Sequence, residues 1–305
     1  MAEVDMDKLA SELRGAVTDG VVLENVPMST LTTFKIGGPA RIVVDAASIV
    51  DVLAAADACK TAGVDFRIIG CGSNILACDE GLDCVLLRFG ESFAEVNIDG
   101  EYLFAQAGAT NEQIAAAALD AGLAGYEFAS GIPGTVGGAA YMNAGAYDGQ
   151  FADVAVSVTC LDDAGQLVEL DAEQAQFSYR HSLMMEEGYT ILGATLKLHA
   201  DDKDAIKARM DDLKQRREEK QPLEMPSAGS TFKRPEGYFA GKLIQDAGLK
   251  GYRVGGAMVS DKHSGFVVNA GGATAADVLQ LIQDVHDKVY AMEGVHMEPE
   301  VRIWK

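Results

Sequence analysis

The first part of the chain alternates between helical and extended spacing of its apolar residues. Apolar side chains stand at helical intervals near the start, at Met6, Leu9, Leu13 and Val17. This spacing predicts a short amphipathic helix. A strand is then expected at 41–45, a helix at 48–62 and a buried strand at 66–69. Because Ser48 is a typical N-cap and Gly63 a typical residue to end a helix, we predict a β-α-β unit here.

The loop Gly70-Cys-Gly-Ser-Asn74 follows the strand at 66–69 directly, and another apolar strand is expected at 84–89. Loops at the ends of strands are where α/β folds often bind ligands. This loop is therefore a candidate ligand-binding segment.

The middle of the chain changes to short strands and tight turns. One hairpin turns at Asp99-Gly100, and Thr110 with Gln113 forms a capping-box pattern for a helix that ends near Gly122. The strands expected in this region are at 95–98, 102–107, 154–161, 166–170 and 189–198. The pattern indicates a mixed α+β region.

The last third begins with a charged helix at 201–220, and the prolines Pro222 and Pro226 after it indicate a boundary. Helices at 238–247 and 274–292 and strands at 256–259, 266–269 and 300–304 are expected beyond it. We therefore predict three segments at 1–88, 89–200 and 201–305. We expect that the last strand can pack back on the first segment.

Composition narrows the possible partners and locations. The formal net charge is −21, which repels nucleic acids unless a basic face is segregated. The segment 201–220 holds seven Lys/Arg but also seven Asp/Glu, so it is no such face. Five cysteines without CxxC and five histidines without HExxH predict neither disulfides nor a metal site. No apolar run approaches the roughly 18 residues of a membrane span, and we expect a cytoplasmic protein.

A stretch without positive charge contains the densest glycine run. No Lys, Arg or His occurs from Gly90 to Tyr179, yet Ser130-Gly-Ile-Pro-Gly-Thr-Val-Gly-Gly138 lies within it. A phosphate at this loop would have to be held by backbone N–H groups. The first cation after the stretch is Arg180, which makes it a candidate for stabilising charge at a reacting group.

Neither glycine loop fits the dinucleotide fingerprint GxGxxG between a strand and a helix. Spacing alone leaves two interpretations open, structural turns or a phosphate cradle. Two separated glycine loops, each preceded by an apolar strand, favour a cradle for a large cofactor.

Five motifs in one order resemble the UDP-N-acetylenolpyruvoylglucosamine reductase (MurB) family over about residues 26–302. They are Thr33-Phe-Lys-Ile-Gly-Gly-Pro39, Gly70-Cys-Gly-Ser-Asn74, Gly131-Ile-Pro-Gly134, Asn143-Ala-Gly-Ala-Tyr147 and Ser227-Ala-Gly-Ser-Thr-Phe-Lys233. The resemblance implies an α+β chain with an FAD-binding fold of the vanillyl-alcohol-oxidase (PCMH) type in two subdomains and a C-terminal α/β substrate-binding domain. It also implies reduction of an enolpyruvyl ether on a UDP-sugar, with non-covalent FAD and with NADPH as the hydride donor.

The resemblance implies specific residues for each task. Hydride transfer to the enolpyruvyl group leaves an enolate-like charge, which Arg180 and Glu300 would stabilise while Ser230 supplies a proton. A serine hydroxyl is a poor general acid, but it is acidic enough toward a carbanion. Glu298 is the main rival to Glu300, because both lie on one face of an extended segment.

The remaining implied residues bind ligands. FAD would contact Gly37, Gly38, Gly70, Cys71, Gly72, Ser73, Asn74, Gly108, Gly131, Ile132, Gly134, Thr135, Gly137 and Gly138. The sugar nucleotide would contact Lys233, Tyr238, Lys262 and Asn269. Each of these residues, taken alone, is also compatible with a structural or surface role.

Two other functions remain open. One is a flavin-dependent alcohol or sugar oxidase with the same fold, and the other is a non-catalytic nucleotide-binding protein. Only residues 183–188 separate Ser182 from the next strand, so the chain resembles a shorter subtype that lacks a tyrosine-bearing insertion over the substrate. We expect a monomer or a weak homo-oligomer.

Overall fold

The computed structural model describes residues 4–305, which form two compact units. Each unit is built from three stretches of sequence. Unit 1 contains the described residues up to Glu24 together with Ile42–Cys71 and Cys84–Arg216. Unit 2 contains Asn25–Arg41, Gly72–Asp83 and Arg217–Lys305. This grouping follows compactness, and the division into three functional segments stays a prediction.

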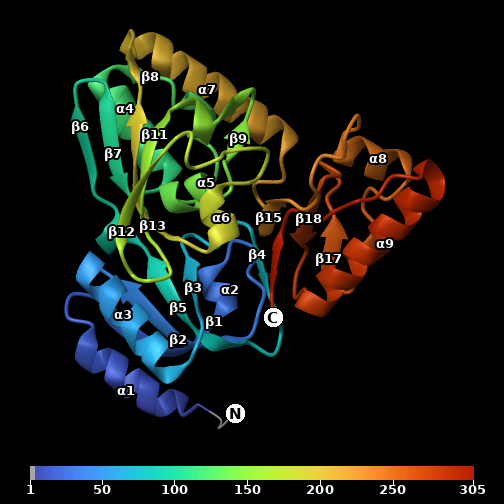
Figure 1. Cartoon of the computed structure of the whole chain (residues 1–305). Helices are drawn as coiled ribbons and strands as arrows, with labels where there is room; N and C mark the ends of the chain where they lie inside the picture. Colours follow the sequence, from blue (N-terminus) through green and yellow to red (C-terminus); the bar gives the residue numbers. More distant parts are fainter. Residues whose placement is uncertain (1–3) are drawn as a thin grey trace. The chain divides into compact units, whose positions relative to one another are not determined.

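The helices are distributed along the whole chain (Figure 1). The α-helices are α1 (Met6–Ala16), α2 (Met28–Leu31), α3 (Ile49–Ala62), α4 (Asn111–Ala121), α5 (Val136–Tyr141), α6 (Leu183–Glu187), α7 (Lys203–Lys220), α8 (Ala240–Asp246) and α9 (Ala275–Glu293). Short 3-10 helices are η1 (Glu91–Phe93), η2 (Glu127–Ala129) and η3 (Phe151–Asp153). Within residues 4–305, none of the helices has both the length and the apolar character that crossing a membrane requires.

The strands fall into several small sheets. Those in the first half are β1 (Val21–Pro27), β2 (Pro39–Ala46), β3 (Phe66–Ile69), β4 (Ile75–Ala77), β5 (Leu82–Phe89), β6 (Val96–Asp99), β7 (Tyr102–Gln106), β8 (Leu123–Ala124), β9 (Gly145–Ala146) and β10 (Gly149–Gln150). The others are β11 (Ala155–Leu161), β12 (Leu167–Asp171), β13 (Thr190–Lys197), β14 (His199–Ala200), β15 (Ser227–Ser230), β16 (Arg253–Val254), β17 (Ala257–Val259), β18 (Phe266–Asn269) and β19 (Arg302–Trp304).

A five-stranded antiparallel sheet in the order β12-β11-β13-β7-β6 forms the centre of unit 1. The predicted hairpin of β6 with β7 is confirmed, and the strands expected at 154–161 and 166–170 also pair, as β11 with β12. The capping box that was predicted for α4 is also present, because Thr110 Oγ1 accepts from the Gln113 amide and Gln113 Oε1 accepts from the Thr110 amide. Local signals therefore determine these elements.

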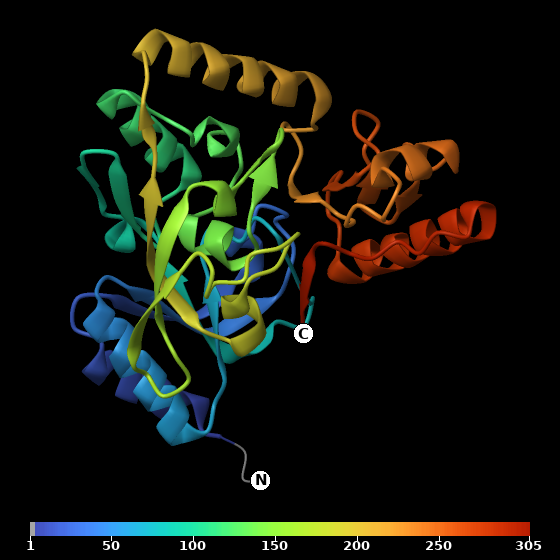
Figure 2. The same ribbon diagram turned by 45° about the horizontal axis from the view of Figure 1, so that its top comes forward.

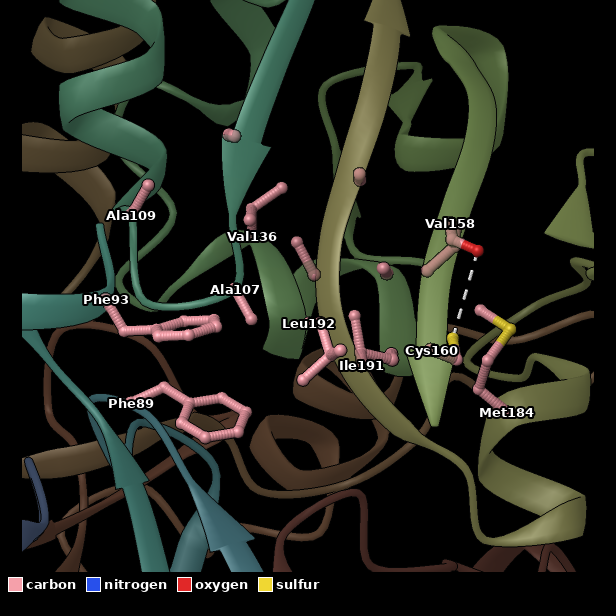
Figure 3. Close-up of a cluster of buried hydrophobic side chains, with 14 of the residues drawn as sticks. Phe89, Phe93, Ala107, Ala109, Val136, Val158, Cys160, Met184, Ile191 and Leu192 are labelled. Carbon is pink, nitrogen blue, oxygen red and sulfur yellow. Dashed lines mark hydrogen bonds between the residues drawn. The ribbon is translucent and has the colours of Figure 1, made fainter. Parts of the chain in front are cut away.

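The core of unit 1 reaches from this sheet to the glycine-rich region (Figure 3). The rings of Phe89 and Phe93 stack with centroids 5.0 Å apart. Val136, at the start of α5, is fully buried in the same cluster. Burial of Val136 anchors the end of the glycine run to the core, because exposing such a side chain costs about 1.5–3 kcal/mol.

A second sheet has the order β1-β2-β5-β3, with β3 and β5 parallel. The predicted β-α-β pattern is confirmed, and α3 begins after the N-cap Ser48 and ends at Gly63 in the left-handed conformation. Helices α1 and α3 lie side by side (Figure 1). The fully buried Asp51 on α3 accepts hydrogen bonds from the amides of Thr18, Asp19 and Ala47, which connects the two helices.

Unit 2 centres on the antiparallel sheet β15-β18-β17-β16, against which α9 packs (Figure 2). Two links join the early stretches of sequence to this unit. Asp79 accepts hydrogen bonds from the amides of Ala275 and Ala276 at the start of α9, at 2.7 and 3.0 Å. Strand β19 pairs in parallel with β4. Unit 2 therefore depends on contacts between residues 75–79 and the last third of the chain.

Several elements, among them β1, α2, β4, α5, α6 and β15, were not predicted from the sequence. Helix α5 has the sequence Val-Gly-Gly-Ala-Ala-Tyr, and glycine disfavours helix by about 1 kcal/mol per residue. Its formation depends on the Thr135 N-cap and on burial of Val136. Tertiary packing overrides local propensity here.

Candidate active site

The glycine run of unit 1 packs tightly against the connection between β7 and α4. The amides of Val136 and Gly137 donate to the carbonyls of Ala109 and Ala107, at 2.8 and 3.0 Å. A Cβ on Gly137 would lie 2.9 Å from the Ala107 Cβ. Gly108 in that connection is also required, because its Cβ would lie 2.5 Å from two backbone oxygens. Both glycines therefore allow the backbones to approach closely.

The two glycine loops that the sequence singled out meet within unit 1. A Cβ on Gly70 would lie 2.6 Å from the Thr135 Oγ1. Thr135 in turn caps α5 by accepting from the Gly138 amide. Gly70 and Thr135, which are 65 residues apart in sequence, thus belong to one local structure. A cradle for a large ligand requires such an arrangement.

The backbone donors of the 131–138 loop are only partly used inside the protein. The Ile132 amide donates to Ala129, and the amides of Val136, Gly137 and Gly138 also have acceptors. Among residues 4–305, the amides of Gly131, Gly134 and Thr135 have no acceptor. Gly134 has φ +136°, a conformation open only to glycine. These three amides fit an anionic group such as the FAD diphosphate, since no cationic side chain occurs between positions 90 and 179.

Of the other predicted cofactor residues, Cys71 belongs to unit 1 and the rest belong to unit 2. Cys71 is an exposed free thiol. Close packing requires glycine at Gly37, Gly38 and Gly72. A Cβ on Gly38 would lie 2.2 Å from the Asp79 carbonyl oxygen, and a Cβ on Gly72 would lie 2.2 Å from the Leu31 carbonyl oxygen. Ser73 follows Gly72 directly. The side-chain amide of Asn74 donates to the backbone carbonyl of Glu300, a predicted catalytic residue. Their contact with FAD stays a prediction.

Two of the predicted catalytic residues, Ser230 and Glu300, are brought together in unit 2. Phe232 and Pro299 form an antiparallel bridge, and the Glu300 amide donates to the Thr231 carbonyl at 2.8 Å. Ser230 is exposed at the end of β15, and its Oγ has no partner among residues 4–305. The Asn74 side-chain amide holds the Glu300 carbonyl at 3.2 Å. Paired backbone therefore fixes the two residues on neighbouring segments.

The register of these segments also separates Glu300 from its rival. Glu298 lies opposite Lys233, whose amide donates to the Glu298 carbonyl at 2.9 Å. Their side chains form an exposed ion pair, with Nζ and Oε2 3.1 Å apart. This pairing engages both Glu298 and Lys233. The choice of Glu300 over Glu298 stays a prediction.

The third predicted catalytic residue, Arg180, lies in unit 1 at the tip of a tight turn. Ser178 and His181 exchange two backbone hydrogen bonds across the turn, at 3.1 and 3.2 Å. Arg180 has φ +53°, which costs a non-glycine residue roughly 1–2 kcal/mol. Its guanidinium donates to the Gly145 carbonyl at 3.3 Å and lies 5.1 Å from the Tyr179 ring centre. Such strain persists only where the surroundings impose it.

The predicted substrate residues are all in unit 2, and several have structural partners. Lys262 Nζ donates to the Glu218 carbonyl at 2.6 Å. Asn269 donates to the Phe34 carbonyl and accepts from the amides of Gly271 and Ala273. Tyr238 is exposed. Asn269 organises a loop, and a role of these residues in substrate binding stays a prediction.

One polar residue was quoted in a motif but given no role. Asn143 has 2% of its surface exposed and φ +43°. Asparagine tolerates this left-handed conformation better than most residues, and a buried amide needs partners. Burial and backbone conformation are visible only in the structure, so the sequence alone assigned no role to Asn143.

Comparison with known proteins places these features in context. Residues 221–304 match the C-terminal domain of UDP-N-acetylenolpyruvoylglucosamine reductase, and residues 40–171 match an FAD binding domain. The UDP-N-acetylenolpyruvoylglucosamine reductase of Clostridium beijerinckii is 49% identical to this chain over 277 residues, which cover 91% of each chain. Another from Alkaliphilus oremlandii is 46% identical over 300 residues, covering 98% of this chain and 99% of the relative. The crystal structure of the reductase MurB from Thermus caldophilus matches with a TM-score of 0.81 and 33% identity, over 94% of this chain and 99% of that one.

Proposed function

Because the chain belongs to the UDP-N-acetylenolpyruvoylglucosamine reductase family, we propose that it reduces UDP-N-acetylglucosamine enolpyruvate to UDP-N-acetylmuramate. The family resemblance and the α+β flavin fold that the motifs predicted are confirmed. The chain is an FAD-dependent oxidoreductase. The observation that carries the proposed reaction is the 46–49% identity to reductases of this name along nearly the whole chain.

Family membership supports FAD as the cofactor and NADPH as its reductant. The unpaired amides of Gly131, Gly134 and Thr135 would hold the cofactor diphosphate. When bound, the reduced flavin supplies the hydride for the substrate's carbon–carbon double bond. The residues of the protein must then manage the charge and the proton of the product.

Hydride addition to the enolpyruvyl group leaves negative charge shared between a carbon atom and the adjacent carboxylate. Arg180 would stabilise this charge with its guanidinium, in line with the general need for preorganised positive groups at developing anions. Glu300 would act beside Arg180 in stabilising this charge, as the family resemblance implies. The Ser230 hydroxyl would donate a proton to the carbon.

The position of Ser230 supports its role as proton donor. Its Oγ is exposed and has no partner among residues 4–305, and paired backbone fixes Glu300 on the neighbouring segment. A structural serine would more often be hydrogen-bonded to its own backbone. Ser230 is therefore available to a ligand.

Anaerobic mixing in two steps tests the proposed reaction. NADPH should bleach the flavin absorbance of the loaded protein, and the enolpyruvyl substrate should then restore it. If the substrate leaves the bleached flavin unchanged while oxygen restores it, the proposed reaction is wrong. Hydrogen peroxide formed from an alcohol substrate would instead support an oxidase.

The variant Ser230→Ala should slow the second step by about 10²–10⁴-fold, the usual contribution of a general acid. The first step, reduction by NADPH, should keep its rate, because no proton donor to the substrate is needed there. Ser227→Ala is a matched control on the same strand. Equal rates of flavin restoration in Ser230→Ala and the native protein would remove Ser230 from the mechanism.

A further inference from the structure

The geometry points to Asn143 as the positioning residue that holds Arg180 in place for the reaction. This inference rests on the proposed function, because it assigns Arg180 to the reaction. Asn143 lies just after α5, two residues before the carbonyl of Gly145 that the Arg180 guanidinium contacts. It would act through the backbone of the Arg180 turn, without touching substrate itself.

The hydrogen bonds of Asn143 connect three segments of unit 1. Its Nδ2 donates to the Ser178 carbonyl and to the Gln150 Oε1, both at 3.0 Å. Its Oδ1 accepts from the Ala152 amide at 2.9 Å. This arrangement needs a group that donates twice and accepts once, which an amide can do and a carboxylate cannot. The Asn143 side chain is therefore matched to its surroundings atom by atom.

The turn that carries Arg180 is anchored on both sides to the segment 141–145. Asn143 holds the carbonyl of Ser178 before Arg180. After Arg180, the Ser182 hydroxyl, which is fully buried, donates to the Tyr141 carbonyl at 2.6 Å. Tyr141 is the last residue of α5, and Ser182 is the N-cap of α6. The two helices accordingly lie next to each other (Figure 1). The turn is thus fixed at two points.

The conformation of Arg180 makes these anchors necessary. A non-glycine residue at φ +53° relaxes to a more common conformation unless the flanking residues prevent it. The reciprocal bonds between Ser178 and His181 close the turn but do not attach it to the rest of unit 1. Asn143 and Ser182 attach the backbone on either side of Arg180 to the segment 141–145. Loss of the Asn143 anchor would let the guanidinium move relative to the atoms it must stabilise.

Replacement of Asn143 by aspartate tests whether Asn143 anchors the Arg180 turn. Asn143→Asp keeps the acceptor for Ala152 but removes both donated bonds and places an oxygen against the Ser178 carbonyl. We expect flavin restoration by the enolpyruvyl substrate to slow by about 10²-fold, the loss that a displacement of about 1 Å can cause, with kcat falling more than KM rises. Flavin reduction by NADPH should keep its native rate. Hydrogen exchange at the Ser178 and His181 amides should become faster.

Two further variants keep the test decisive if Asn143→Asp folds poorly. Asn143→Gly removes the side chain without strain at φ +43° and should show the same selective loss. Gln150→Ala is the matched control, because it removes a side-chain partner of Asn143 but keeps the Asn143 bond to Ser178 and the backbone pairing of position 150 with Gly145. It should leave both steps at native rates. Equal losses in Gln150→Ala and Asn143→Gly would overturn the inference.

A double variant separates positioning from general damage. If Asn143 acts through Arg180, adding Asn143→Asp to Arg180→Ala should slow flavin restoration little further, since contributions that share one path are not additive. If the rate of flavin restoration in the double variant falls by the product of the two single losses, the positioning role is contradicted. Failure of the native protein to restore the flavin with substrate would reject the proposed function instead, so the two outcomes are distinguishable.

Discussion

At the scale of single residues, buried polar side chains hold this fold together by matching several backbone groups at once. Asp51 accepts from three amides in two separate segments, and Asn143 joins three segments in the same manner. A buried polar group without partners costs about 1–3 kcal/mol, so each such residue strongly favours one arrangement of its neighbours. The family resemblance assigned no role to either residue.

Asp51 gives a prediction about pH. Desolvation raises the pKa of its carboxyl, but hydrogen bonds from the amides of Thr18, Ala47 and Asp19 outweigh this effect, so the pKa lies below the ordinary value of 3.8. A depressed pKa stabilises the fold above pH about 4, and the contribution is lost as the pH falls through the folded-state pKa.

Asp51→Asn should therefore lower the free energy of unfolding at pH 7 by about 1–3 kcal/mol. Urea denaturation of both proteins at several pH values measures the difference, which should shrink as the pH falls below about 4. Asp57→Asn, on the same helix, is the control. A difference that grows toward low pH would contradict this assignment.

At the scale of elements, the loops that the sequence singled out are set by close approach. Gly70 comes so near Thr135 that no larger residue fits, and Thr135 caps α5. The geometry of one loop therefore controls the donors of the other. The sequence showed both loops but gave no sign that they touch.

Gly70→Ala should displace Thr135 and reduce the amount of bound flavin, because the new Cβ would lie 2.6 Å from the Thr135 Oγ1. The ratio of flavin to protein absorbance after purification measures this. Gly90→Ala is a matched control, since its Cβ would have no atom within 4 Å. Native flavin content in Gly70→Ala, in a protein that is folded, would argue against this loop as part of the cofactor site.

Elements with local signals were predictable, and those formed by distant contacts were not. Ser48, Gly63, Thr110 and Gln113 set the ends of their helices by bonds within a few residues, and the sequence places these ends correctly. Helix α5 was missed because its glycines disfavour helix and its stability comes from Val136 in the core. The pairing that places Ser230 near Glu300 joins opposite ends of the last third, so only the family resemblance indicated it.

At the scale of the whole molecule, charge opposes the ligands of the proposed reaction. The chain carries a formal charge of −21, while NADPH and a UDP-sugar are both anions. Long-range repulsion of this kind slows association and is screened by salt, with a Debye length of about 10 Å at 0.1 M.

The value of kcat/KM for both NADPH and the sugar nucleotide should therefore rise as ionic strength increases from about 0.01 to 0.1 M. Initial rates at low substrate concentration over a series of sodium chloride concentrations measure this. A neutral reductant such as a dihydronicotinamide without phosphates is the control, and its rate should stay constant. A fall in kcat/KM over this range would show that cations near the site outweigh the net charge.

The parallel pairing of β4 with β19 has a consequence for synthesis of the protein. Ile75–Ala77 is translated more than 200 residues before its partner, Arg302–Trp304. Unit 2 therefore cannot be completed during most of translation, whereas most of unit 1 has its strands available sooner. A stop codon at or before position 302 would leave β4 permanently without its neighbour.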